Sequence, residues 1–156
     1  MDKLTEVVDK YGNMVYRLAI SYLKNTHDAQ DIVQEVFIKY YNNEGKIQSE
    51  EHLKSWLLRV TINLCKDKLR FYKQHPYINI ETIKTTYPED SIDNQILAIL
   101  LELPSKYKEV LLLYYVEGYK CFEISKILKI TESTVKKRLE RGRKLLKKKL
   151  GVNECG

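Results

Sequence analysis

The sequence has few of the residues that cross-link, bend or interrupt a chain: three cysteines, three prolines and six glycines among 156 residues. Cys65, Cys121 and Cys155 are odd in number and far apart, so they form neither a disulfide framework nor a CxxC metal site. No apolar run approaches the roughly eighteen residues of a membrane span. The start, MDKLTEVVDKYG, has no apolar core followed by a cleavage site. We therefore expect a cytoplasmic protein with no membrane insertion of its own.

Motifs that carry catalysis are also missing. The three histidines, His27, His52 and His75, are scattered without metal-ligand spacing. There is no glycine-rich phosphate loop and no nucleophile motif. We expect no enzyme activity, no metal site and no cofactor.

The net charge of +6 is concentrated in one part of the chain. Residues 92–156 hold 14 Lys and Arg against 8 Asp and Glu, which accounts for the whole excess. Within them, residues 131–150 carry nine basic side chains and two acidic ones. This concentration indicates a polyanionic partner for the C-terminal part.

Apolar residues recur every three to four positions over most of the chain, which predicts an all-α fold. The expected helices are residues 3–24, a second helix ended by Asn42–Gly45, then 49–72, 92–103 and 105–117. Thr26 or Asp28 is expected to cap the second helix, and Gly118 to cap the last of these. Residues 75–91 contain two prolines and no helical period, which predicts a flexible linker between two small helical domains, 1–74 and 92–156.

Residues 119–150, YKCFEISKILKITESTVKKRLERGRKLLKKKL, have the pattern of a helix-turn-helix. Lys129 and Ile130 form the short turn, and Lys129 must take a left-handed conformation there. Thr131 can cap the second helix, whose Val135 and Leu139 pack inward. The second helix of such a motif enters the DNA major groove with its N-terminal residues at the base edges.

The outward side chains of this second helix are hydrogen-bond donors and acceptors suited to bases, since Lys and Arg donate to guanine and Glu accepts from cytosine. The residues expected to contact DNA bases are Ser133, Thr134, Lys136, Lys137, Arg138, Glu140 and Arg141. The residues expected to contact the DNA backbone are Arg143, Lys144 and Lys147.

Two segments in the N-terminal half, DAQDIVQEVFIKYY (28–41) and LKSWLLRVTINLCKDKLR (53–70), resemble region 2 of the extracytoplasmic-function (ECF) sigma factors. The helix-turn-helix, with LPSKYKEVLLLYYVEGY before it, resembles region 4 of the same family. The resemblance covers nearly the whole chain, in the family's order. It implies a subunit that joins core RNA polymerase, binds the −35 and −10 promoter elements and helps to open the duplex.

In the family, an acidic surface on region 2 docks on the polymerase. The matching residues, spaced to share one helix face, are Asp28, Asp31, Gln34 and Glu35. The residues matching the part of region 2 near the −10 element are Asn63, Lys66, Asp67 and Arg70. The loop 42–51 resembles the family's pocket for a flipped base. Trp56 lies in register with Leu57 and Val60 and is expected in the core.

The chain departs from the family at Ser125, Lys129 and Gly142, where alanine, glycine and alanine are common. Gly142 costs roughly 1 kcal/mol of helix stability relative to alanine. It is expected either to bend the second helix or to mark its end.

Three questions stay open at the level of the sequence. The resemblance implies an anti-sigma factor as a further partner. A stand-alone helix-turn-helix regulator, dimerised through its N-terminal helices, would instead bind a palindromic duplex without polymerase. A helical adaptor whose basic end meets an acidic protein is the alternative without DNA.

Overall fold

The computed structural model describes residues 2–76, 98–100 and 102–151 of the chain. The described residues form helices and no strand, which confirms the all-α fold class for that part of the chain. The chain divides into two compact units, Met1–Thr85 and Thr86–Gly156. Residues 77–91 of the expected linker and 92–97 of the expected fourth helix lie outside the described residues. The first unit contains α1 (Lys3–Leu23), α2 (Thr26–Asn43), a 3₁₀ turn, η1 (Glu44–Lys46), and α3 (Glu50–Gln74). The second unit contains α5 (Ser105–Leu111), a π-helical turn, η2 (Leu112–Val116), α6 (Cys121–Leu128) and α7 (Glu132–Lys149).

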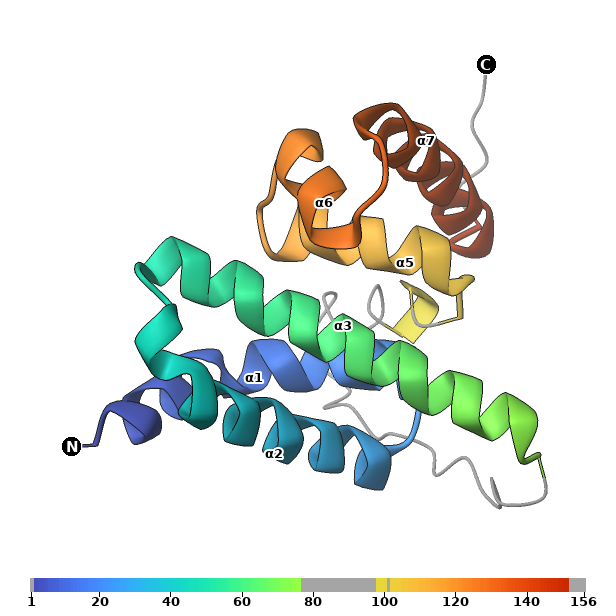
Figure 1. Ribbon diagram of the computed structural model, residues 1–156. Coiled ribbons are helices and arrows are strands. Elements are labelled where there is room, and N and C mark those ends of the chain that lie inside the picture. Colours follow the sequence, from blue (N-terminus) through green and yellow to red (C-terminus); the bar gives the residue numbers. More distant parts are fainter. Residues whose placement is uncertain (1, 77–97, 101, 152–156) are drawn as a thin grey trace. The chain divides into compact units, whose positions relative to one another are not determined.

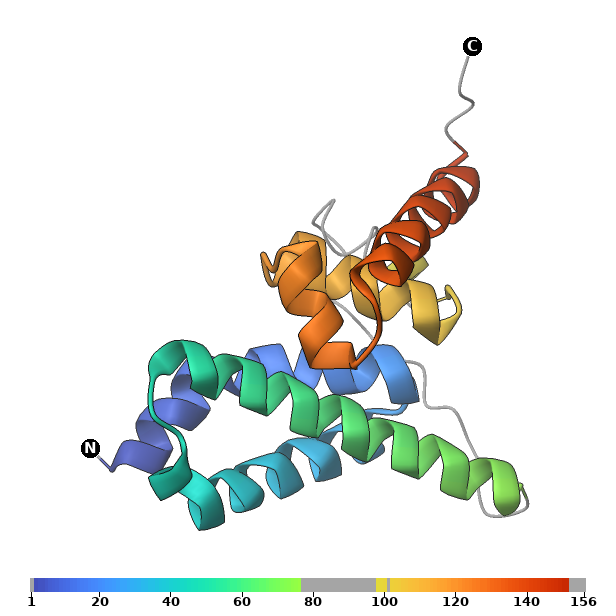
Figure 2. The same cartoon turned by 45° about the horizontal axis from the view of Figure 1, so that its top comes forward.

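In the first unit, α1, α2 and α3 pack against one another as a three-helix bundle (Figures 1 and 2). The expected cap of α2 was wrong. Asn25 is the N-cap, and its side-chain oxygen accepts a hydrogen bond from the Asp28 backbone N–H at 3.0 Å. Thr26 is the first helical residue, so its hydroxyl is not in the capping position.

The face of α3 that is buried in the core of this unit differs from the face expected from the sequence. Leu57, Leu58 and Cys65 are fully buried, and Ile62 is 3% exposed. Trp56, expected in the core, is only half-buried and meets the Tyr40 ring edge-on, with ring centroids 6.4 Å apart. The buried stripe runs through positions 57, 58, 61, 62 and 65 because α3 contacts both α1 and α2. A helix that packs against two neighbours buries a broader face than one that packs against a single partner.

In the second unit, α5 continues directly into the π-helical turn η2, which ends before Gly118. Gly118 has φ +77°, and the next residue, Tyr119, donates its backbone N–H to the Leu113 carbonyl at 2.9 Å. Glu117 is the C-cap residue, so the left-handed Gly118 lies one position beyond the predicted cap, at C′, where glycine commonly ends a helix. The buried side chains of this unit come from every helix in it, among them Val110, Leu113, Ile124 and Val135.

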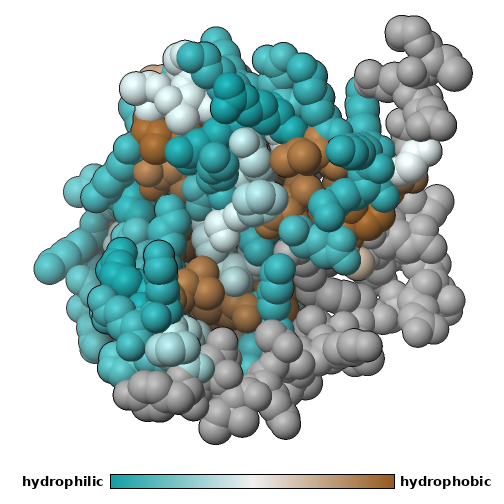
Figure 3. Space-filling model, turned by 90° about the vertical axis from the view of Figure 1, so that its right-hand side faces the viewer, coloured by the Kyte–Doolittle hydropathy of each residue, from teal (hydrophilic) through white to brown (hydrophobic). Residues whose placement is uncertain are grey.

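The coloured part of the face drawn in Figure 3 is mainly hydrophilic, with apolar side chains gathered in a few patches. Among the described residues, none of the helices combines the length and the apolar character needed to cross a membrane.

Candidate nucleic-acid and polymerase interfaces

The turn between α6 and α7 is built as the sequence predicts. Lys129 is left-handed, with φ 58°, and the following Ile130 donates its backbone N–H to the Ser125 carbonyl at 3.1 Å. The Thr131 hydroxyl oxygen accepts a hydrogen bond from the Thr134 backbone N–H at 3.1 Å. The predicted cap is therefore confirmed, and the turn fixes the direction in which α7 leaves α6.

On α7, five of the seven residues expected to contact bases are exposed: Ser133, Lys136, Lys137, Glu140 and Arg141. They lie on the side opposite the buried Val135 and Leu139. Lys136 pairs with Glu132 at 3.6 Å. Within the part of the chain that the structure describes, Lys137 and Arg141 form no ion pair. Among the described residues, no carboxylate lies within ion-pair distance of either charged group.

The other two expected base contacts, Thr134 and Arg138, are half-buried and are engaged by other residues of the unit. The Thr134 and Thr131 hydroxyl oxygens lie 2.7 Å apart. The Arg138 guanidinium lies 3.7 Å from the carboxylate of Glu109, whose side chain is only 4% exposed. A buried carboxylate needs a nearby cation or hydrogen-bond donors. Arg138 therefore joins α7 to α5, and the structure places it away from the exposed face.

Two of the three expected backbone contacts, Lys144 and Lys147, are exposed near the end of α7. Lys144 pairs with Glu140 at 3.5 Å, an exposed i,i+4 pair. Such pairs contribute only about 0.3–0.5 kcal/mol, so a phosphate can replace the carboxylate. Arg143 is half-buried and donates to the Tyr115 hydroxyl at 3.0 Å.

Gly142 has a packing role that the sequence did not reveal. The helix continues seven residues beyond it to Lys149, so the expected helix end was wrong. Gly142 is buried, and a Cβ added there would lie 3.0 Å from Leu111 Cδ1 and 3.3 Å from Tyr107 Cβ. The missing side chain lets α7 approach α5 closely, and this accounts for a glycine at position 142.

An apolar groove of about 340 Å³ lies beside this contact, and the spacing of residues along the chain does not predict it. The groove is lined by Leu100, Leu111, Tyr115, Val116, Arg143, Leu146 and Lys147. It depends on the π-helical turn, whose Tyr115 and Val116 are exposed.

On α3, all four residues expected near the −10 element are exposed: Asn63, Lys66, Asp67 and Arg70. Asp67 accepts a hydrogen bond from Arg70 at 3.1 Å, and both side chains are 65% exposed. Because the residues repeat at intervals of three and four, they form one polar strip along the helix.

A hollow of about 200 Å³ opens where α2 passes into α3, against the loop expected to form a base pocket. Tyr40, Ile47 and Leu53 give it apolar walls, and Glu44, Gln48 and Glu50 give it polar ones. Glu50 accepts hydrogen bonds from the Tyr11 hydroxyl at 2.6 Å and from Lys10 at 3.2 Å. These two bonds lower the pKa of Glu50 and hold its carboxylate against α1.

The acidic face of α2 consists of three exposed residues, Asp31, Gln34 and Glu35, and not of the four expected. Asp28 is 8% exposed. It accepts a hydrogen bond from the Tyr72 hydroxyl at 2.7 Å and lies 3.6 Å from Lys68 Nζ. Asp28 is thus a brace between α2 and α3, and the structure does not place it with the other three on the exposed face.

The arrangement around Asp28 also affects Tyr72. Burial, followed by the hydrogen bond to Asp28 and its charge, raises the pKa of Tyr72 to about 12.

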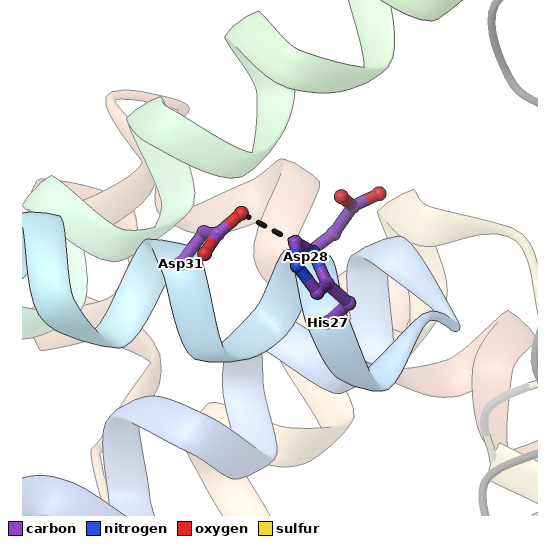
Figure 4. Close-up of side chains that lie close together, drawn as sticks. All are labelled: His27, Asp28 and Asp31. Atoms are coloured by element: carbon purple, nitrogen blue, oxygen red, sulfur yellow. Dashed lines mark ion pairs between the residues drawn. The ribbon is translucent and has the colours of Figure 1, made fainter.

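His27, Asp28 and Asp31 have donor atoms within 4.8 Å of one another. His27 and Asp31 point toward each other at 3.4 Å, whereas the Asp28 carboxylate is directed away from them (Figure 4). The Asp28 carboxylate is bound by Tyr72 and Lys68 of α3, so within this cluster the ion pair is the one between His27 and Asp31.

Both halves of the chain match known protein families. Residues 7–74 match sigma-70 region 2, and residues 93–146 match sigma-70 region 4. The ECF RNA polymerase sigma factor SigW of Bacillus subtilis (strain 168) is 34% identical over 167 aligned residues, covering 96% of this chain and 89% of SigW. The chain belongs to the ECF sigma factors of the sigma-70 family.

Further relatives of this ECF sigma factor agree. The RNA polymerase sigma factor SigV of the same Bacillus strain is 37% identical over 135 residues, covering 85% of this chain and 81% of SigV. The sigma factor RpoE of Bartonella quintana, solved with the anti-sigma factor NepR, has the same fold. It aligns with a TM-score of 0.84 at 21% identity, covering 99% of this chain and 100% of that chain. Sigma factors are transcription initiation factors that bind core RNA polymerase and recognise promoters, and they are not enzymes.

Proposed function

We propose that this chain is an alternative sigma factor that reads the −35 element as duplex DNA with α7 and engages the melted −10 strand with α3 and the loop before it. In this proposal residues 1–74 serve the polymerase and the −10 element, and residues 92–156 serve the −35 element. Residues 75–91 link the two. The observation that carries the proposal is the exposed basic face of α7, fixed in a helix-turn-helix within a chain of this family.

For the −35 element, Lys137 and Arg141 are the favoured base contacts. They are exposed, they form no ion pair among the described residues, and they lie on successive turns of one face. Ser133 and Lys136 extend the same face, and Glu140 is placed to accept from a cytosine amino group. Thr134 and Arg138 act indirectly in this proposal, through the helix cap and through the anchor to Glu109.

Phosphate contacts are assigned to the exposed end of α7. Lys144 and Lys147 are exposed there, and Lys144 is held by only a weak surface pair. Lysines that meet phosphates add affinity without adding sequence preference. We expect their loss to weaken binding to all DNA alike.

For the −10 element, the polar strip on α3 is assigned to the melted strand. Asn63 can hydrogen-bond the edge of an unstacked base. Lys66 and Arg70 lie one helical turn apart and are assigned to phosphates of the DNA backbone. Unstacking a base costs a few kcal/mol, which contacts of this kind offset. The hollow at the start of α3 is the proposed receptor for one flipped base.

Docking on core RNA polymerase is assigned to the exposed acidic face of α2. Asp31, Gln34 and Glu35 carry it, and Asp28 supports it by bracing α2 against α3. An exposed acidic face suits a basic surface on the partner, which favours fast and specific association.

An anti-sigma factor is proposed as the regulator. The support is a protein of the same fold, RpoE of Bartonella quintana, solved in complex with the anti-sigma factor NepR. A partner that spans both units should protect α2 and α7 from hydrogen exchange together. Protection of one unit alone would argue against this mode of inhibition.

In vitro transcription tests the proposed function directly. The chain is added to core RNA polymerase with a pooled genomic template, and new start sites are mapped against core polymerase alone. Discrete new starts with shared upstream sequences are expected, and these sequences define the −35 and −10 elements. No new transcripts, together with tight binding of a palindromic duplex by the chain alone, would instead identify a stand-alone dimeric regulator.

A further inference from the structure

The C-terminal end of α3 carries a pair of stacked rings that the proposed function does not use. The rings of Phe71 and His75 lie face to face, with centroids 4.3 Å apart and planes 24° apart. Phe71 is 45% exposed, although a phenylalanine gains free energy from burial. Both ribbon views show this end of α3 extending beyond α1 and α2 (Figures 1 and 2). The ring pair is therefore open to a partner.

The ring pair is held in place before any partner arrives. The His75 backbone N–H donates to the carbonyls of Phe71 and Tyr72 at 3.0 and 3.2 Å, and the ring nitrogen Nδ1 lies 3.0 Å from the Phe71 carbonyl oxygen. Tyr72 meets the Phe71 ring edge-on, with centroids 6.0 Å apart, and its hydroxyl donates to Asp28 of α2. Because these contacts order the rings in advance, a partner that stacks on them loses little affinity to ordering.

The surroundings of the ring pair are basic. Four basic residues and one acidic residue lie between positions 66 and 73: Lys66, Lys68, Arg70, Lys73 and Asp67. Asp67 accepts a hydrogen bond from Arg70 at 3.1 Å, which offsets its charge. Lys73 is exposed and forms no ion pair among the described residues. Proteins hold single-stranded DNA with this combination, in which rings stack on bases and cations meet phosphates.

We infer that Phe71 and His75 form a stacking platform for one base of the melted −10 strand. This inference rests on the proposed function and adds a contact beyond the polar strip on α3. Phe71 lies eight residues from Asn63, about 12 Å along the helix. Successive bases of a stacked strand are about 3.4 Å apart, so at most about four nucleotides separate the base at Asn63 from the base at Phe71. The melted strand reaches both sites without leaving α3.

Stacking and groove contact make different demands on the DNA. Every base has a flat face, so a ring that stacks on an unpaired base tolerates all four bases and requires only that a base be present. A phenylalanine in the groove of a duplex instead contacts the thymine methyl group and favours that base. The platform of Phe71 and His75 is a flat stack of rings in a basic surrounding, which favours the unpaired base.

The test measures binding of the polymerase holoenzyme to a short fragment of a promoter found by the transcription experiment. The non-template strand of the −10 element is left single-stranded, and the −35 element is omitted so that the second unit contributes no specific contact. Each nucleotide of this strand, and of about four nucleotides on either side, is replaced in turn by the other three bases and by an abasic site. At one position the four bases should bind almost equally, whereas the abasic site should lower affinity roughly five- to 150-fold.

Variants assign the abasic penalty to the rings. Phe71→Leu keeps an apolar side chain without the ring, so it should bind the intact fragment more weakly and lose most of the penalty. Phe71→Tyr keeps the ring and should behave like the parent. His75→Leu removes the second ring independently and should lower the penalty in part. Phe122→Leu is the matched control, because Phe122 is 54% exposed on α6 of the second unit, and it should keep the full penalty.

Trp56 emission during unfolding shows whether the first unit of each variant is folded, since Trp56 is the single tryptophan of the chain. Four outcomes would overturn the inference. The parent could show no such position, the folded Phe71→Leu and His75→Leu variants could keep the full penalty, Phe122→Leu could relieve it equally, or the position that depends on Phe71 could prefer thymine. In each of these cases transcription from the parent promoter persists, so the proposed function stands. If the chain directs no transcription from any template, the inference and the proposed function fail together.

Discussion

The hydrogen bond from Tyr72 to Asp28 offers a direct measure of how the α2 face is held. Tyr72→Phe removes only the hydroxyl that donates to Asp28 at 2.7 Å and leaves Lys68 at 3.6 Å. A hydrogen bond to a charged group contributes about 1.5–3 kcal/mol. Tyr72 is half-buried, so we expect a loss near the lower limit, about 1.5 kcal/mol. For a unit of this size that corresponds to a fall in Tm of roughly 6–12 °C.

The assay follows the fluorescence of Trp56 during thermal and urea unfolding. Trp56 is the single tryptophan of the chain and packs on Tyr40, so its emission reports the first unit alone. Tyr41→Phe is the matched control, because Tyr41 is 60% exposed on α2. It should unfold like the parent. Equal stability of Tyr72→Phe and the parent would refute the reasoning.

The burial of Tyr72, together with its hydrogen bond to Asp28, predicts a dependence of stability on alkaline pH. The pKa of Tyr72 rises from 10.0 to about 12 on folding. A group whose pKa is raised by folding contributes stability that is fully present below the unfolded pKa and is lost as pH rises through the folded pKa. The parent should therefore lose stability relative to Tyr72→Phe between pH 10 and pH 12. Parallel curves for the two proteins over that window would contradict the assignment.

Three further predictions concern the proposed DNA and polymerase interfaces and the packing of α7 on α5. Arg141→Ala should weaken specific promoter binding by roughly 1–3 kcal/mol in a gel-shift assay with holoenzyme, leaving core binding intact; an equal loss on random DNA would instead mean a phosphate contact. Glu35→Lys should lower affinity for core polymerase by at least about tenfold in a pull-down titration, through like-charge repulsion; unchanged affinity would remove this face from the interface. Gly142→Leu should destabilise the second unit by about 1–3 kcal/mol, because even a Cβ at this position would lie 3.0 Å from Leu111 Cδ1. Urea unfolding followed by hydrogen exchange of α7 measures this loss. Unchanged exchange would show that α5 shifts to make room for the larger side chain.

Local chemistry explains which features of the site could be predicted. The turn of the helix-turn-helix depends on residues close together in the chain, so the left-handed Lys129 and the Thr131 cap were both predicted correctly. The exposed strip from Asn63 to Arg70 follows from helical spacing alone. The α2 cap was predicted at the wrong residue because Asn25, Thr26 and Asp28 are all capable of capping.

Tertiary contacts decided the rest. Asp28 and Arg138 carry charges that look available on a helix face, yet Tyr72 lies 44 residues from Asp28 and Glu109 lies 29 residues from Arg138. No helical period reveals a partner at that distance. Trp56 was assigned to the core because its spacing fitted, but α3 packs on two helices and turns this side chain halfway to solvent.

The sequence by itself determined the all-α class, the helix-turn-helix and the family, because these depend on period, turn chemistry and the order of motifs. Only the tertiary structure decided which charges remain available for a partner and which are used to hold one helix against another. It also formed the hollow that brings Tyr40 and Glu44 together and the close approach that requires Gly142. These features depend on distances between helices, which the spacing of residues along one helix does not specify.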